Sequence, residues 1–416
     1  MKVAYCSLLL PEEKHLAERA KERLSGISLH KFTRAVIEGL DQNLEEPVTV
    51  FNIINTLNYP KFPDLVFKTE RWHHKDNSDD WHIGYINLIA VKYITQAYNL
   101  YRKLDQWVRN FKDEPCIVCV HHIYFPSMYA ALKLKRKYGR KIQLCLITGD
   151  MNGKFGLASQ YKANLKSFLL KFVERKIDRM AKDYDCFVFA TKNMAEAFEV
   201  EKKPFTVVEC AYIAPPDSEK AQTNSEDETK KIIFYAGAIR REYGIIHLLK
   251  AFAMIEGSEY RLWLAGDGNA VSDVQSFAKE DSRVEYLGFL TPKQVDECQR
   301  KASVLISPRV AGNYEYVKYS FPSKTMECLA SGKPYIAHKL PCDPPEYAEY
   351  IQYVEGESDA ALAKKIEKVC SMSKEQRREI GDRAKKFVEN EKNPTVMTKR
   401  ISALWEMLVR EDEKKI

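Results

Sequence analysis

The stretch that decides the fold is Tyr319-Ser-Phe-Pro-Ser-Lys-Thr-Met-Glu-Cys-Leu-Ala-Ser-Gly-Lys-Pro-Tyr-Ile-Ala-His338. It follows the apolar run Val304-Leu-Ile-Ser-Pro308, which is typical of a short buried strand. Ser323 is a good helix cap, and Gly332 with the proline two residues later closes a helix. Tyr335-Ile-Ala337 then resumes as a strand. The stretch therefore predicts a strand, a loop, a short helix and a second strand.

The start of this predicted helix carries groups that suit a phosphate. Pro322, Ser323 and Lys324 lie where free backbone N–H groups and the helix dipole attract anions. Glu327 follows one turn later and could accept two hydrogen bonds from a ribose diol. A solvated surface helix explains the lysine and the glutamate equally well when the segment is considered alone.

The segment resembles the nucleotide-sugar-binding motif of retaining glycosyltransferases of family 4, which have the GT-B fold. In that motif a Glu, seven residues and a second Glu lead into a helix that ends in Ala-Ser-Gly-x-Pro. Glu327 through Pro334 match the second half, whereas Tyr319 stands in place of the first Glu. The form Tyr-Ser-Phe-Pro-Ser-Lys-x-x-Glu is similar to a subgroup that builds capsular and exopolysaccharides.

Length and composition set the limits of the interpretation. A chain of 416 residues suits two domains of about 200 residues each. The net charge of +7 is too small to imply a nucleic-acid partner. The ten cysteines form no paired framework, and we expect buried thiols rather than a zinc site at Cys116 and Cys119. Because no signal peptide opens the chain and no apolar run approaches 18 residues, we expect a cytoplasmic protein.

The first half alternates strands with helices, which indicates a parallel sheet with crossovers. Ligands of such sheets bind at the carboxyl ends of the strands. His121 and His122 end the predicted strand Cys116–His121, and Asp150 follows the next strand. Family members often carry a catalytic His in the loop that Asp150 occupies. We therefore take His121, His122 and Asp150 as acceptor-side candidates, and a simple capping role for Asp150 stays open.

Three other segments of the first half have competing interpretations. The polar region around His73-His74 and Asp79-Asp80 is predicted to be a solvated loop rather than a metal site. Asp183-Tyr-Asp185 has the form of a metal-binding triplet, but we assign it to a helix-to-strand turn. Residues 161–182 are predicted to form a basic amphipathic helix, here named the basic helix. It packs against the sheet or lies on an anionic membrane surface, and both roles are compatible.

A second doubly wound domain begins after a polar linker. Its first strand, Lys231–Tyr235, leads into a loop that holds Gly237, Arg240 and Arg241. Family members hold the donor diphosphate with an Arg and a Lys from this loop, but those positions are Ala238 and Tyr243 here. We infer that Arg240 or Arg241, together with Lys324, supplies the charge instead.

The resemblance implies an α/β protein of two Rossmann-like doubly wound domains that face a central cleft. The expected parts are an acceptor domain at 1–213, a linker at 214–229, a donor domain at 230–393 and a helix at 394–416 that crosses back to the first domain. The predicted catalytic residues are Asp150, Lys324 and Arg240, and the predicted donor-binding residues are Gly237, Arg240, Arg241, Gly266, Gly268, Gly288, Phe289, Tyr319, Ser320, Pro322, Ser323, Lys324 and Glu327.

The predicted reaction moves a sugar from a nucleotide diphosphate sugar to a glycan acceptor, with retention and without a metal or cofactor. The resemblance further implies an acceptor linked to a polyprenyl lipid, met by the enzyme at the inner face of the cell membrane. A non-catalytic scaffold that binds nucleotide sugars is the first alternative. A nucleotide-dependent oxidoreductase is disfavoured because the run Ser7-Leu-Leu-Leu-Pro11 after the first strand has no glycine.

Overall fold

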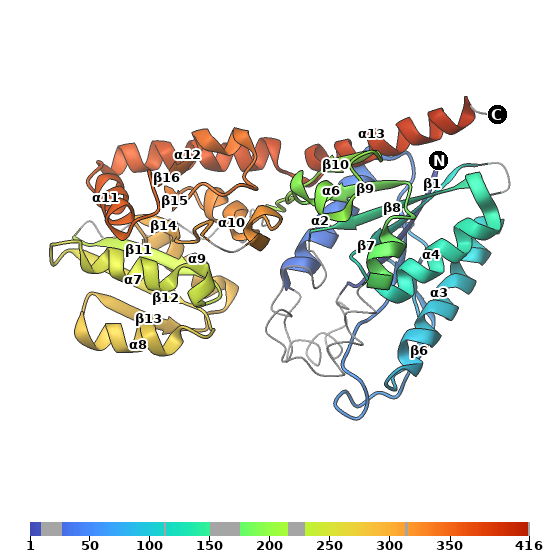
Figure 1. Cartoon of the computed structure of the whole chain (residues 1–416), viewed down its shortest axis with the longest axis horizontal. Helices are drawn as coiled ribbons and strands as arrows, with labels where there is room; N and C mark the ends of the chain where they lie inside the picture. Colours follow the sequence, from blue (N-terminus) through green and yellow to red (C-terminus); the bar gives the residue numbers. More distant parts are fainter. Residues whose placement is uncertain (10–26, 112–113, 150–174, 215–228, 313–314, 415–416) are drawn as a thin grey trace. The chain divides into compact units, whose positions relative to one another are not determined.

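The computed structural model describes residues 1–9, 27–111, 114–149, 175–214, 229–312 and 315–414. By its internal contacts the chain divides into two units (Figure 1). The first unit contains Met1–Ala211 and Pro394–Ile416, and the second contains Tyr212–Asn393. The C-terminal helix that we expected to return to the first domain thus belongs to the first unit. Most of the expected linker, residues 215–228, lies outside the described residues.

An eight-stranded sheet forms the centre of the first unit, in the order β10-β9-β8-β7-β1-β2-β5-β4. Its strands are β1 (Lys2–Ser7), β2 (Thr49–Asn52), β4 (Glu70–Trp72), β5 (Asp80–His82), β7 (Cys116–His121), β8 (Ile142–Thr148), β9 (Cys186–Phe189) and β10 (Phe205–Val207). All neighbours pair in parallel except β4 with β5. Every residue of β7 and β8 is buried, as expected for parallel strands covered on both faces. After β1 the chain first adds strands on the β2 side and later adds strands on the β7 side. The strand order therefore reverses between β1 and β7.

Helices cover both faces of this sheet (Figure 1). They are α2 (Ile27–Asn43), α3 (Val91–Arg109), α4 (Phe125–Tyr138), α6 (Asn193–Phe198) and α13 (Pro394–Glu413). Helix α13 packs on α2, where Gly39 is needed because a Cβ there would lie 2.2 Å from the Pro394 carbonyl oxygen. Met397, Ile401 and Trp405 of α13 are completely buried in the same core cluster as the strands. The C-terminal helix therefore completes the core of the first unit.

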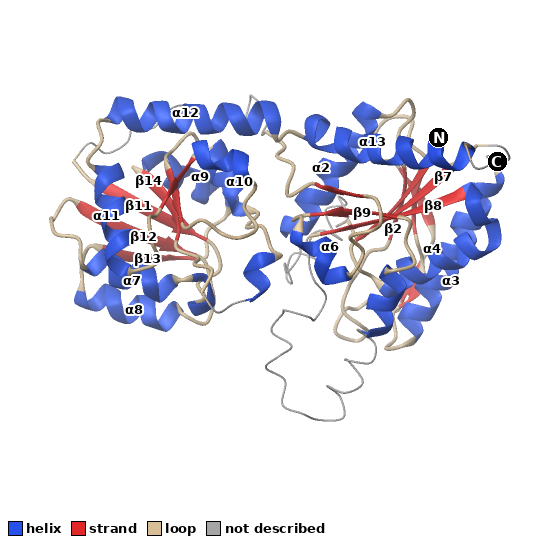
Figure 2. Cartoon of the chain, turned by 45° about the horizontal axis from the view of Figure 1, so that its top comes forward, coloured by secondary structure: helices blue, strands red, loops and turns tan. Residues whose placement is uncertain are grey.

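The second unit is built on a six-stranded parallel sheet in the order β13-β12-β11-β14-β15-β16. Its strands are β11 (Lys231–Ala236), β12 (Tyr260–Ala265), β13 (Val284–Gly288), β14 (Val304–Ser307), β15 (Tyr335–Ala337) and β16 (Ile351–Tyr353). Its helices are α7 (Ile245–Ala253), α8 (Val271–Glu280), α9 (Pro292–Lys301), α10 (Lys324–Ala330), α11 (Asp359–Cys370) and α12 (Lys374–Glu391). In Figure 2, α7 and α8 lie on one side of the strands and α12 on the other. The strand order reverses between β11 and β14. Doubly wound sheets bind their ligands at such a reversal.

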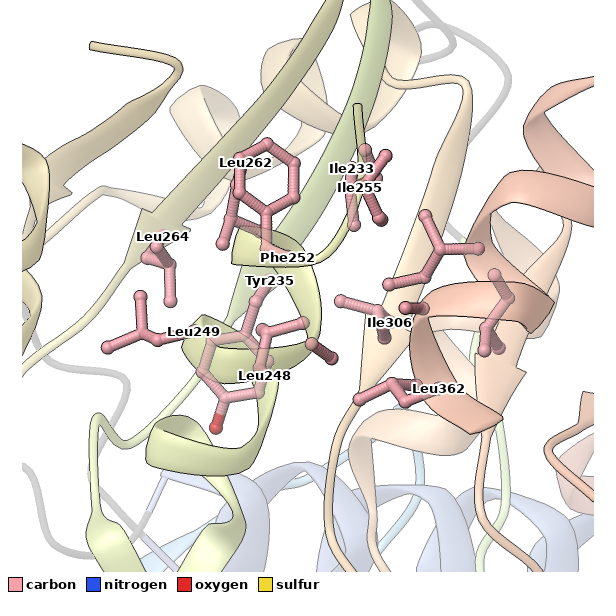
Figure 3. Close-up of a cluster of buried hydrophobic side chains, with 14 of the residues drawn as sticks. Ile233, Tyr235, Leu248, Leu249, Phe252, Ile255, Leu262, Leu264, Ile306 and Leu362 are labelled. Carbon is pink, nitrogen blue, oxygen red and sulfur yellow. The ribbon is translucent and has the colours of Figure 1, made fainter. Parts of the chain in front are cut away.

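Helix α7 shows how the sequence pattern becomes a core. Its apolar residues recur at the spacing of one helix face, and they include Leu248, Leu249 and Phe252. These side chains point at Leu262 and Leu264 of β12 (Figure 3). All five are at most 3% exposed. Burying a side chain of this size contributes roughly 1.5–3 kcal/mol, so this face fixes α7 and the loop before it.

The structure corrects two local predictions of the first unit. The sequence pattern predicts one helix over residues 83–111, but the helix begins only at Val91, because Tyr85-Ile86 forms strand β6. This strand pairs with β3 (Val66–Phe67), within residues 58–78, whose polar and aromatic composition predicts irregular structure. The short strand β4 lies in the same region. Such short pairings depend on partners 8 to 20 residues away, which the local pattern does not show.

The remaining structural predictions of the first half divide into confirmed and untested ones. Asp183 and Asp185 lie in the predicted turn, and Asp185 accepts a hydrogen bond from the Leu144 backbone N–H at 2.7 Å. All ten cysteines are free thiols. The basic helix is described only from residue 175, so its predicted apolar stripe lies almost wholly outside the described residues.

Candidate active site

The loops at the carboxyl edge of the second sheet carry the predicted donor-binding residues. Because all six strands are parallel, the loops that follow them lie along one edge. The loop after β11 holds Gly237, Arg240 and Arg241, and the loop after β12 holds Gly266 and Gly268. Gly288 ends β13, and Phe289 follows it. The segment after β14 holds Tyr319, Ser320, Pro322, Ser323, Lys324 and Glu327. The topology thus collects residues that are up to 90 positions apart along the chain.

Glycines allow two of these loops to cross closely. A Cβ on Gly266 would lie 1.7 Å from the Gly237 carbonyl oxygen, and one on Gly268 would lie 2.2 Å from the Ile239 carbonyl oxygen. Both glycines have positive φ, at +135° and +156°. Backbone hydrogen bonds join the loops, from Gly237 N to Ala265 O at 2.9 Å and from Ile239 N to Asp267 O at 2.8 Å. The structure therefore gives these glycines a packing function that shapes the edge.

Gly288 and Phe289 differ from these glycines. A Cβ on Gly288 would meet no atom within 4 Å, although its φ is +69°. Its carbonyl oxygen accepts a hydrogen bond from Gly266 N at 2.8 Å. The Phe289 side chain is 76% exposed directly beside it. Gly288 thus has space for a side chain, and Phe289 exposes its ring at this end of the edge.

The two adjacent arginines of the first loop have different surroundings. The Arg241 guanidinium donates to both carboxylate oxygens of Asp273, with Nε at 3.0 Å and Nη2 at 2.8 Å from Oδ2. The half-buried Arg240 side chain makes no hydrogen bond or ion pair with any residue that the structure describes. Arg240 is therefore the arginine whose guanidinium remains available to a ligand.

Helix α10 presents Lys324 and Glu327 on its exposed side. Their side chains are 49% and 38% exposed, and Lys324 Nζ lies 3.8 Å from a Glu327 carboxylate oxygen. The opposite face buries Met326 and Leu329, as the apolar stripe predicts. Ser323 corrects the sequence analysis, because its backbone is helical and its hydroxyl caps no N–H group. A capping serine needs an extended backbone, and here a turn enters the helix directly.

Sequence reasoning missed Arg309, which follows β14 at the point where the sheet changes direction. Its side chain is 9% exposed, and its guanidinium carbon lies 4.7 Å from the centre of the Tyr316 ring and 5.5 Å from that of Tyr243. Its Nε and Nη2 atoms are buried without a hydrogen-bond partner. The available signal was an arginine immediately after a buried strand, in Pro308-Arg309.

The acceptor-side histidines lie at the corresponding position of the first unit. His121 ends β7, accepts or donates a hydrogen bond at the Tyr5 hydroxyl, and stacks on His122 with ring centres 4.0 Å apart. His122 has a φ of +74°, a strained value that often marks a functional residue. Burial lowers the pKa of His122 to about 3, so the ring is neutral at neutral pH. Asp150, the third candidate, lies outside the described residues.

The region of His73-His74 and Asp79-Asp80 is not the solvated loop that we predicted. His74 is bonded at Nδ1 to Asp80 and at Nε2 to Asp41, both at 2.8 Å, and its side chain is 11% exposed. Burial alone would lower the pKa of His74, but hydrogen bonds to the two carboxylates outweigh it and raise the pKa to about 9. Within the described ranges, no group of three or more His, Cys, Asp or Glu side chains could hold a metal ion.

Comparisons with known proteins agree with this geometry. Residues 217–387, which make up most of the second unit, match the family described as "Glycosyl transferases group 1". The chain is similar in structure to sucrose-phosphate synthase from Thermosynechococcus elongatus, with a TM-score of 0.64 and 15% identity over 99% of this chain and 100% of that one. It is also similar to the lipopolysaccharide outer core galactosyltransferase WaaB, with a TM-score of 0.59 and 15% identity over 98% and 99%.

A third similar structure, from E. coli, is described as "Trehalose-6-phosphate … bound with UDP-2-fluoro glucose", with a TM-score of 0.60 and 12% identity over 97% and 99% of the two chains. No curated protein matches the sequence. The structural likenesses confirm the predicted GT-B fold. The matched domain confirms the predicted enzyme class, a glycosyltransferase. No helix of the described residues is long and apolar enough to span a membrane.

Proposed function

We propose that the enzyme transfers a sugar from a nucleotide diphosphate sugar to a glycan acceptor, with retention and without a metal ion. The second unit binds the donor, and the first unit binds the acceptor near His121, His122 and Asp150. One observation carries this proposal: Arg240 and the half-exposed Lys324 supply cations at the carboxyl edge of a sheet that lies within the matched domain. A nucleotide sugar bound to the E. coli neighbour supports the donor class.

Departure of the nucleoside diphosphate creates negative charge that the protein must stabilise. Lys324 and Arg240 carry this task as fixed cations, and Glu327 accepts hydrogen bonds from the ribose. Removing one such preorganised donor costs roughly 3–4 kcal/mol in enzymes generally. Activity is therefore expected to survive chelation by EDTA. Loss of activity on chelation, restored by manganese, would contradict the metal-independent mechanism.

The first test compares the two adjacent arginines. Lys324→Ala and Arg240→Ala should weaken binding of the nucleoside diphosphate by roughly tenfold to hundredfold, since a charge-assisted hydrogen bond contributes about 1.5–3 kcal/mol. Binding of the bare nucleoside should stay unchanged. Arg241→Ala is the matched control, because Asp273 already holds its guanidinium. Calorimetric titration measures the binding of both ligands. A loss of affinity confined to Arg241→Ala would assign the diphosphate contact to Arg241 and contradict the choice of Arg240.

The second test separates an enzyme from a non-catalytic scaffold. Glu327→Ala should abolish both transfer and slow donor hydrolysis while the protein stays folded, because the side chain lies on the exposed side of α10. Release of nucleoside diphosphate from a panel of nucleotide sugars reports the activity. If the wild-type protein binds a nucleotide sugar but never releases the diphosphate, the scaffold becomes the better description.

We further propose that the acceptor is linked to a membrane lipid. Eleven of the sixteen large apolar side chains that are exposed in the described residues fall between positions 57 and 98, which we name the apolar patch. They are Leu57, Tyr59, Leu65, Val66, Ile86, Leu88, Ile89, Val91, Tyr93, Ile94 and Tyr98. The buried Asn87 joins these segments, since its side chain donates to the Leu57 and Asp64 carbonyl oxygens at 2.9 and 3.1 Å.

The composition of the second half of the apolar patch favours a bilayer surface. Residues 83–98 contain no Asp or Glu, and the neighbouring segment exposes Lys61, Lys68 and Glu70. Tyrosine side chains, three of them in the patch, are typical of the boundary between lipid and water. The sequence of residues 161–182 contains seven lysines and arginines, each of which would add about 1 kcal/mol to the attraction where it faces the lipid.

Co-sedimentation with vesicles of anionic lipid tests this docking. Binding should weaken in high salt and again when Ile89 and Ile94, which are 74% and 69% exposed, become Asp. Met254→Asp is the matched control, because this 55% exposed methionine belongs to the second unit. Replacing Lys166 and Lys171 by Gln tests the basic helix separately. Absence of binding at low salt would favour a soluble acceptor.

A further inference from the structure

Arg309 has an environment that no internal contact explains. Its Nε and Nη2 atoms are buried and have no hydrogen-bond partner, although the side chain is more than nine-tenths buried. The rings of Tyr243 and Tyr316 lie against the guanidinium, and such contacts act on its face. Hydrogen bonds from a guanidinium leave in its plane, so the two rings do not satisfy these N–H groups.

A neighbouring carboxylate does not satisfy Arg309 either. Among the described residues, no carboxylate oxygen lies within 4.0 Å of its nitrogen atoms. The charge of Arg309 acts to lower the pKa of Asp343, although burial raises that pKa overall. Asp343 accepts its hydrogen bonds from the Leu340 N–H and the Tyr353 hydroxyl, both at 2.9 Å. A buried charge without a partner destabilises a fold by several kcal/mol as a rule. An arginine retained at this cost points to a ligand.

The position of Arg309 indicates which ligand it meets. Strands β11 and β14 are neighbours, and the sheet changes direction between them. The backbone of the Arg309 segment touches the loop that carries Arg240, since a Cβ on Gly244 would lie 2.1 Å from the Pro308 carbonyl oxygen. Arg309 therefore lies at the carboxyl end of a central strand, in contact with the loop assigned to the donor.

We propose that Arg309 binds an oxyanion of the nucleotide-sugar donor through its guanidinium, and that a local shift on binding exposes the buried Nε and Nη2 atoms for a paired contact. A phosphate of the diphosphate and a carboxylate on the sugar both offer two acceptor oxygens with the required spacing. This inference rests on the proposed function and adds a donor contact that the family motif does not contain. The Tyr316 and Tyr243 rings lie 4.7 and 5.5 Å from the guanidinium carbon, so cation–π attraction helps to keep the side chain at this position.

The test uses the full-length protein and two substitutions. Arg309→Gln removes the charge at similar length, and Arg309→Lys keeps the charge without the paired N–H groups. Thermal shift selects the tightest ligand from uridine, guanosine and adenosine diphosphates and from the hexose and hexuronate esters of each. Calorimetry then measures its affinity. Arg309→Gln should lower that affinity at least tenfold, and Arg309→Lys should restore only part of it.

The ligand panel also distinguishes the two sources of the oxyanion. An equal loss for the free nucleoside diphosphate and for its sugar esters assigns Arg309 to a phosphate. A loss confined to the hexuronate ester assigns it to the sugar carboxylate. In either case Arg309→Gln should leave the melting temperature of the unliganded protein unchanged or higher, because the unpaired buried charge is gone.

Opposite results would overturn the inference. If Arg309→Gln lowers the melting temperature of the unliganded protein and leaves every affinity unchanged, the arginine supports the fold through its stacked tyrosines. If Lys324→Ala and Arg240→Ala weaken binding while Arg309→Gln does not, the inference fails and the proposed function stands. If the wild-type protein binds no member of the panel, both fail together.

Discussion

Gly266→Ala is the substitution whose effect can be worked out most fully from the structure. The new Cβ would lie 1.7 Å from the Gly237 carbonyl oxygen, whereas real Cβ atoms essentially never approach a heavy atom within 3.0 Å. Both groups belong to backbone, so no side chain can rotate away. The loops after β11 and β12 must therefore separate by about 1 Å or more, a displacement that can reduce catalysis roughly 100-fold.

This displacement should reach the donor site because Arg240 lies three residues after Gly237 on the same loop. We expect donor turnover to fall by about 100-fold and stability by more than the roughly 1–2 kcal/mol that a left-handed alanine costs alone. Gly139→Ala is the matched control. Gly139 also has a positive φ, at +59°, but a Cβ there would meet no atom within 4 Å.

The assay measures release of nucleoside diphosphate together with thermal unfolding. Gly139→Ala should lose at least the roughly 1–2 kcal/mol of backbone strain and keep full activity, so that the loss of turnover in Gly266→Ala reports the crossing of the two loops. A folded Gly266→Ala protein with wild-type turnover would refute the reasoning. It would mean that the loops separate without moving the groups that bind the donor.

Three further predictions concern stability, for which hydrogen exchange reports each segment separately. The pKa of His74 is raised from 6.5 to about 9, which corresponds to a stabilisation of roughly 3 kcal/mol. This stabilisation is complete below about pH 6.5 and is lost as the pH rises through about 9. His74→Gln should abolish this pH dependence of hydrogen exchange in β4 and β5. Burial lowers the pKa of His338 to about 4. The contribution of the neutral ring to stability is therefore present above about pH 6.5 and is lost as the pH falls through about 4, with faster hydrogen exchange around β15. A pKa of His338 near 6.5, measured by NMR, would contradict this prediction. Trp405→Ala should destabilise the first unit by roughly 3–5 kcal/mol and speed exchange in α2 more than in α7, whereas equal acceleration in both helices would exclude a local core defect.

Features that arise from local periodicity could be predicted from the sequence. The apolar spacing of Leu248, Leu249 and Phe252 predicts α7 and its buried face, and Gly332 with the proline after it predicts the end of α10. The order of strands and helices is sufficient for the doubly wound topology, and with it for the edge on which Arg240 and Lys324 lie.

Features that depend on distant partners could not be predicted in this way. The environment of His74 is set by Asp41, which is 33 positions away. Only the tertiary structure shows that Arg309 is buried without a partner. The role of Gly266 likewise depends on the loop after another strand. The GxG pattern, which is typical of ligand binding, here allows the loops after β11 and β12 to pack closely.

The chain order of the first unit has a consequence for how the protein is made on the ribosome. Residues 212–393 separate the N-terminal portion of this unit from α13, which supplies Met397, Ile401 and Trp405 to its core. The second unit is continuous in sequence and can fold as soon as it leaves the exit tunnel. Until α13 has been synthesised, the apolar face of α2 lacks this packing partner. The interval is the time needed to make residues 212–393 at a synthesis rate of roughly 5–20 residues per second. A nascent chain at this stage is the form of the protein that most needs a chaperone.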